Sequence, residues 1–179
     1  MRRFLLLTAA LSALLPGLRG SARAGQTNEE QCLIAVLQLG ASPAEKDAAC
    51  ARLKLVGTDR SVPALAELLT DEQLSHSARY ALECLPSAKA GRALTAALAK
   101  TSGLTRAGII SSLGCRGEAR AVSALVRLLR EPDAGEAAAL ALGQIGGAKA
   151  LKALRSATAS TTGPAHRAAV DGCLRCANR

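Results

Sequence analysis

The sequence predicts an all-α protein, a right-handed α–α superhelix of about four helical pairs between two capping helices. Three observations indicate this fold: a block of residues recurs four times, apolar residues recur at helical spacing, and small helix-forming side chains dominate. Hydrophobic residues make up 49% of the chain, but aromatic residues only 1%. Because alanine has the highest intrinsic helix propensity, this composition favours stacked helices over a sheet.

The recurring block is a helix that ends in a turn, followed by a second helix with a leucine at a fixed place. The copies occupy residues 52–69, 81–98, 109–129 and 140–157. Their anchor leucines are Leu65, Leu94, Leu125 and Leu154, with spacings of 29, 31 and 29 residues. A repeat of this length is typical of a helical solenoid, in which each pair buries its apolar face against its neighbours.

Helix-capping signals agree with the apolar spacing. Residues 27–30, 42–45 and 133–136 have the order of a capping box, in which a small polar residue precedes a glutamate by three positions. Residues that fit helix C-termini are Gly40, Gly57, Gly114 and Gly146, with Pro86 in the glycine's place in the second repeat. The predicted helices are 28–39, 44–56, 60–70, 76–85, 88–100, 105–113, 118–130, 134–145, 147–159 and 164–176.

The first 24 residues have the parts of a secretory signal peptide. Arg2 and Arg3 precede an apolar stretch from Phe4 to Leu15, and Ala22-Arg23-Ala24 forms a small-residue cleavage site. An uncleaved anchor is the alternative, but the apolar stretch is short for a bilayer span. We therefore expect cleavage after Ala24 and an exported chain, either periplasmic or secreted. Cleavage would remove four arginines and lower the formal charge from +9 to +5.

The resulting organisation has four parts. These are a signal peptide at 1–24, an N-terminal capping helix at 25–43, a repeat array at 44–159 and a C-terminal capping helix at 160–179. The sequences V-P-A-L-A-E-L-L at 62–69 and A-L-A-L-G-Q-I-G at 139–146 resemble HEAT-like repeats of the short type known from phycobilin lyases. The stretch around residues 46–83 also resembles exported HEAT-repeat proteins of planctomycete-like and verrucomicrobial bacteria. This resemblance implies the solenoid fold and says little about activity.

Six cysteines follow the predicted cleavage site, and an even number in an exported chain favours disulfides. The candidate pairs are Cys32 with Cys50, Cys84 with Cys115, and Cys173 with Cys176. Cys32 and Cys50 are almost equally far from the loop that joins the first two predicted helices, so they should lie opposite each other; the alternative is a pair of buried thiols. Haem attachment is excluded because Ala177 stands where that motif needs histidine, and no set of zinc ligands is complete.

No arrangement of catalytic residues is predicted, so we expect a protein that is not an enzyme and binds no cofactor or metal. The two histidines, His76 and His166, lie in different repeats. His76 with Arg79, Tyr80 and the acidic pair at 71–72 is a candidate polar site. The alternative is that these residues cap helices and join neighbouring repeats.

The strongest functional signal is positive charge at repeated positions. A cation stands five residues before every anchor leucine, and further cations follow in the second helices. The set is Arg60, Lys89, Arg92, Arg120, Arg127, Arg130, Lys149, Lys152 and Arg155. The resemblance to HEAT arrays implies that these helices line the concave side of the solenoid. Glu67 and Glu118 interrupt the stripe, and a solvated surface without a partner is the alternative reading.

These observations predict a non-catalytic extracytoplasmic scaffold that uses the concave basic face to bind another protein with an acidic surface, or an anionic polysaccharide. Nucleic acid is not expected as a partner, because aromatic residues for base stacking are missing apart from Tyr80. The resemblance to phycobilin lyases leaves a lyase or chromophore-handling protein as the alternative function.

Overall fold

The structure, a computed structural model, describes residues 17–178, with side chains from Thr27 onward. Within this range the chain forms ten α-helices and three short 3₁₀ segments, with no β-strand. The all-α solenoid predicted from the repeats is confirmed. The core of the predicted signal peptide lies outside the described residues, and its cleavage stays a prediction.

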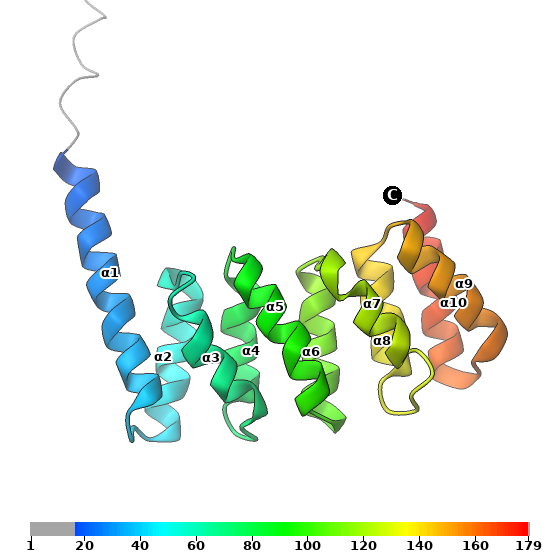
Figure 1. The fold of residues 1–179 in the computed structure, drawn as a ribbon, viewed down its shortest axis with the longest axis horizontal. Coiled ribbons are helices and arrows are strands. Elements are labelled where there is room, and N and C mark those ends of the chain that lie inside the picture. Colours follow the sequence, from blue (N-terminus) through cyan, green and yellow to red (C-terminus); the bar gives the residue numbers. More distant parts are fainter. Residues whose placement is uncertain (1–16, 179) are drawn as a thin grey trace, which may run out of the picture.

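The helices form two layers, as Figure 1 shows. One row, which we call the first-helix layer, consists of α1 (Gly17–Gln38), α2 (Pro43–Val56), α4 (Ser75–Cys84), α6 (Gly103–Cys115), α8 (Gly135–Ile145) and α10 (Gly163–Ala177). The other row, the second-helix layer, consists of α3 (Val62–Glu67), α5 (Ala88–Ala97), α7 (Val122–Leu128) and α9 (Ala148–Ser160). The 3₁₀ segments η1 (Leu68–Thr70), η2 (Leu98–Lys100) and η3 (Ala119–Ala121) extend α3, α5 and α7.

The core lies between the two layers and is built from leucine and alanine. The four anchor leucines, Leu65, Leu94, Leu125 and Leu154, are all 0% exposed, as the repeat pattern requires. Leu53, Leu82, Leu113 and Leu142 occupy the matching places in the first-helix layer and are also fully buried. One leucine from each layer per repeat therefore forms a continuous apolar seam.

Most helix bounds agree with the prediction to within about two residues, but α1 begins at Gly17 rather than near 28. The capping box predicted at 27–30 is therefore wrong, because these residues lie inside a helix. Glu30 is instead buried, at 1% exposure. Its carboxylate accepts hydrogen bonds from the Thr58 backbone N–H at 2.6 Å and the Ser61 hydroxyl at 3.0 Å. This contact joins α1 to the turn before α3.

Of the other two predicted capping boxes, one is confirmed and one is wrong. The box at 42–45 is confirmed: the Ser42 N–H donates to Glu45 Oε2 at 2.7 Å, and hydrogen bonds from Ser42 lower the pKa of Glu45. The box at 133–136 is wrong, because α8 starts after Ala134 without a side-chain cap. Gly146 ends α8 with a φ of 74°, as expected for a helix C-terminus.

Gly114 was predicted to end a helix but lies inside α6, where its role is close packing. A Cβ at this position would be 2.9 Å from the Ala141 Cα of α8. Gly143 repeats the feature one step along, since a Cβ there would be 2.6 Å from the Gly172 Cα of α10. Because glycine has no side chain, these positions let neighbouring helices of the first-helix layer approach closely.

Arg116, which no repeat or charge pattern in the sequence indicated, joins the second and third repeats. Its Nη1 donates to the carbonyl oxygens of Leu82, Glu83 and Leu85 at 2.7–2.8 Å, and its Nη2 donates to the Ser87 carbonyl at 2.8 Å. The last carbonyls of a helix have no partner within the helix and carry partial negative charge. The guanidinium therefore caps the C-terminus of α4 from the next repeat.

Replacing this guanidinium should destabilise the array. We expect Arg116→Met to lower the free energy of unfolding by about 2–3 kcal/mol, because several half-buried carbonyls lose a charged donor. Arg120→Met, at an exposed position without an ion pair among the described residues, should change it by less than about 0.5 kcal/mol. Urea denaturation followed by circular dichroism measures both. Equal stability of the two variants would show that Arg116 has no capping role.

Candidate functional site

All nine cations of the predicted stripe are exposed and lie in or beside the second-helix layer. Arg60, Lys89, Arg120 and Lys149 stand near the starts of the four second helices. The others follow on α5, α7 and α9 or just after α7. We call the exposed surface that these nine side chains share the second-helix face. Whether it is the concave side of the solenoid stays a prediction.

Negative charge is scarce on this face. Helices α5, α7 and α9 and the segments η2 and η3 contain no aspartate or glutamate. Glu67 is exposed on α3, but Glu118, before η3, is half-buried. The Glu118 side chain lies over Gly91 of α5, in the space that a side chain there would fill. Neither of the two acids expected to interrupt the stripe lies on α5, α7 or α9, so these three helices contribute only positive charge.

Two of the recurring cations contact the preceding repeat. Lys89 Nζ is 3.3 Å from Asp59 Oδ2, and hydrogen bonds from Ser87 and Lys89 lower the pKa of Asp59. Lys149 Nζ donates to Ser123 Oγ at 2.7 Å. These two cations of the stripe therefore also join consecutive repeats.

The other seven cations have no ion pair within the described part of the chain. The first-helix layer differs, because four of its seven cations with described side chains form ion pairs. Four ion pairs link Arg52 with Glu29, Arg79 with Glu83, Arg106 with Glu131, and Arg175 with Asp171. Uncompensated positive charge is thus concentrated on one layer of the solenoid.

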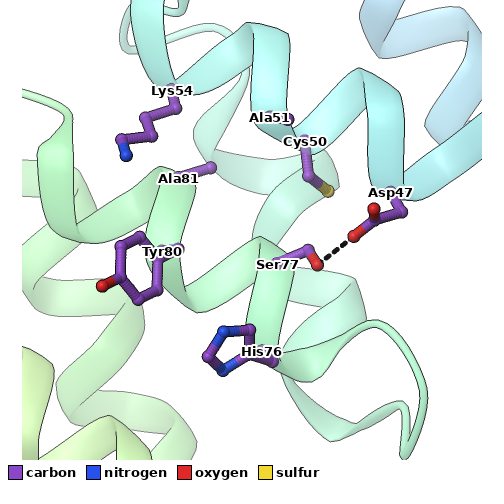
Figure 2. A pocket seen from close by; sticks show the side chains of 8 residues that line it. All are labelled: Asp47, Cys50, Ala51, Lys54, His76, Ser77, Tyr80 and Ala81. Atoms are coloured by element: carbon purple, nitrogen blue, oxygen red, sulfur yellow. Dashed lines mark hydrogen bonds between the residues drawn. The ribbon is translucent and has the colours of Figure 1, made fainter.

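A cavity of about 300 Å³ opens between α2 and α4 of the first-helix layer (Figure 2). Its lining comprises Asp47, Cys50, Ala51, Lys54, His76, Ser77, Tyr80 and Ala81. The Ser77 hydroxyl donates to Asp47 Oδ1 across the two helices. Lys54 Nζ lies 5.1 Å from the centre of the Tyr80 ring, within range of a cation–π interaction.

This cavity contains part of the predicted polar site. Arg79 Nη2 donates to His76 Nδ1 at 2.9 Å, and the rings of His76 and Tyr80 are 5.3 Å apart. The predicted contribution of Asp71 is wrong, because its Oδ1 accepts from the backbone N–H groups of residues 73 and 74 and forms the turn before α4. The carboxylate at the cavity is Asp47, from the previous repeat, which no local sequence signal indicated.

No disulfide is present among the described residues, so none of the predicted bridges is formed in the structure. Cys32 is exposed on α1, whereas Cys50 is fully buried and lines the cavity together with Ser77 and Ala81 of α4 (Figure 2). Equal distance from a loop does not decide which way a side chain points around its helix. Cys84 and Cys115 are exposed, and the pair at 173 and 176 is half-buried on α10.

In the described part of the chain, no three His, Cys, Asp or Glu side chains are grouped so that they could hold a metal ion. Over the same part, we find no helix with the length and hydropathy needed to span a membrane.

The thiol of Cys50 should be unreactive although it lines a cavity. Burial, with a smaller contribution from the nearby carboxylate of Asp47, raises its pKa to about 11. Because the thiolate is the reactive form, we expect maleimide to modify Cys84 and Cys115 at least about 100-fold faster than Cys50 at pH 8. Mass spectrometry of quenched samples measures the three rates. Modification of Cys50 at the rate of the exposed thiols would contradict this assignment.

The raised pKa of Cys50 also implies a pH dependence of stability. Between about pH 9 and pH 11 the thiol is protonated in the folded chain but ionised in the unfolded chain. The free energy of unfolding should therefore be unaffected by this group at neutral pH and should fall as the pH rises through this range.

Comparison with known proteins agrees with this geometry. The family model for HEAT repeats matches residues 91–173, from within α5 to within α10. No curated protein matches the chain significantly. This family model describes HEAT repeats in general. It does not support the finer resemblance to phycobilin lyases or to the planctomycete-like and verrucomicrobial proteins. The same pairing of helices continues on the N-terminal side of the matched region, through α2, α3 and α4. Residues 91–173 are therefore similar to HEAT repeats, and the described chain has an all-α, HEAT-like solenoid fold.

Proposed function

We propose that this chain is a non-catalytic scaffold that binds an acidic surface of another protein through its second-helix face. HEAT repeats suggest a protein-interaction scaffold. The observation that supports this face is its charge: three successive helices carry exposed cations and no acidic residue. A surface kept charged only for solubility would show mixed signs, as the first-helix layer does.

The positions of the cations suit a partner that spans several repeats. Arg120 and Arg127 are separated by two helical turns, so both project from the same side of the η3–α7 segment. Lys149 and Lys152 extend the positive surface onto α9, about 8–10 Å away at typical helix spacing. Such an array attracts an acidic surface from a distance and orients it.

We place this binding outside the cytoplasm, because the first 24 residues have the pattern of a signal peptide. A protein partner is favoured over an anionic polysaccharide by the HEAT-repeat match. For the alternative of chromophore handling we find no supporting observation in the described residues. The cavity between α2 and α4, at about 300 Å³, is at the lower limit of small-molecule sites.

Charge reversal on the second-helix face should weaken partner capture. The test variant is Arg120→Glu with Arg127→Glu, because both side chains are exposed and lack ion pairs. We expect at least about tenfold less partner to be crosslinked and recovered from the intact envelope, since two attractions become repulsions. Capture by the unaltered chain should also decline as salt is raised, because exposed charges are screened.

The matched control reverses two cations of the first-helix layer, Lys46→Glu with Arg167→Glu, which changes the net charge equally. This control should retain capture if the position of the charge is what the partner recognises. Equal loss in both double variants would refute the assignment to the second-helix face. Loss of the captured material on polysaccharide digestion, but not on proteolysis, would refute a protein partner.

A further inference from the structure

The cavity between α2 and α4 has opposite charges at its two ends. Asp47 and Lys54 both line it from α2 and are seven residues apart in the sequence. This spacing places them on the same side of the helix, two turns or about 10 Å apart along its axis. Figure 2 shows Asp47 beside Ser77 at one end of the cavity and Lys54 at the other. The cavity therefore offers a carboxylate at one end and an ammonium group at the other.

Neither of these two charges is neutralised by a neighbour. Among the described residues, Asp47 and Lys54 form no ion pair, with each other or with another side chain. The Ser77 hydroxyl donates to Oδ1 of Asp47, but a carboxylate has further lone pairs with which to accept. Lys54 Nζ lies 5.1 Å from the centre of the Tyr80 ring, which carries no charge of its own. Both groups can therefore pair with a ligand of opposite charge.

The lining between the two charges is apolar. Cys50 and Ala51 stand one helical turn from Asp47 on α2, and Ala81 lines the same part of the cavity from α4 (Figure 2). The Cys50 thiol is uncharged at neutral pH, because burial raises its pKa to about 11. A ligand that matches this lining has an uncharged segment between its two charged ends.

The aromatic wall of the cavity is held in place from a third helix. The rings of His76 and Tyr80 are 5.3 Å apart. Arg79 Nη2 donates to His76 Nδ1 at 2.9 Å, and Arg79 Nη1 donates to the hydroxyl of Ser112 on α6 at 2.8 Å. Ser112 is fully buried, so these hydrogen bonds anchor the wall to the core. A site that is already ordered loses less conformational entropy when it binds a ligand.

We propose that this cavity binds a free peptide of two or three residues, with its terminal amine at Asp47 and its terminal carboxylate at Lys54. An extended chain spans at most about 3.3–3.6 Å per residue, so two or three residues are needed to approach both ends. A single α-amino acid is too short, and the end of a protein chain would supply only one of the two charges. A volume of about 300 Å³ suits a ligand of this size.

The first test is a titration of the full chain with tri-L-alanine, followed by tyrosine fluorescence. The chain has one tyrosine and no tryptophan, so the signal reports on Tyr80 at the cavity. We expect a saturable change with a dissociation constant of about 1 mM or lower, in line with the binding free energy per atom that small ligands reach. N-acetyl-tri-L-alanine and tri-L-alanine amide each lack one charge and should bind at least about tenfold more weakly.

The second test removes the two charges of the cavity and uses isothermal titration calorimetry, because Lys54 lies against the ring that gives the fluorescence signal. Lys54→Met and Asp47→Asn should each raise the dissociation constant for tri-L-alanine at least about tenfold. Lys100→Met and Asp133→Asn are the matched controls, since both residues are exposed and lie outside the cavity lining. They should leave the dissociation constant unchanged, and circular dichroism checks that all four variants fold.

Three outcomes would each overturn the proposal. These are the absence of a saturable response to tri-L-alanine, equal affinity for the free peptide and either blocked peptide, and equal effects of the cavity variants and their controls. Equal affinity for the acetylated peptide would assign the cavity to a carboxylate alone. Partner capture by the second-helix face should be the same for Lys54→Met and the unaltered chain, so failure of one proposal leaves the other intact.

Discussion

The contact between consecutive helical pairs is the constraint on which the rest of this structure depends. Helices such as α3, with six residues, and α7, with seven, are too short to be stable alone in water. Each buries its leucine only because neighbouring pairs complete the apolar seam. Polar contacts reinforce the seam at intervals, through Glu30 between α1 and the turn before α3, and through Arg116 at the end of α4. Stability is therefore a property of the array.

The first-helix layer achieves this contact by omitting side chains. Gly114 allows α6 to meet Ala141, and Gly143 allows α8 to meet Gly172. Such close approach gains van der Waals contact without aromatic residues, of which the described core has none. It also explains how a chain with 1% aromatic composition can still bury a continuous core.

The two layers of the solenoid have different outer surfaces. The first-helix layer pairs four of its seven described cations with carboxylates and also exposes several apolar side chains. The second-helix layer exposes cations that have few partners. A scaffold with positive charge on one face can attract and orient an acidic partner there, because the other face carries charges of both signs.

The sequence alone determined the repeat period, the helical pairs, the buried anchor leucines and the exposure of the nine cations. These follow from local periodicity, since a helix presents residues three and four apart on one side whatever it packs against. Only the tertiary structure decided which polar groups meet. Cys50 lines a cavity with residues of α4 rather than pairing with Cys32, Asp47 joins His76 at the cavity, and Arg116 caps a helix of the preceding repeat. These contacts join residues about 30 positions apart, and their formation depends on the rotation of each helix about its axis, which packing against neighbours sets.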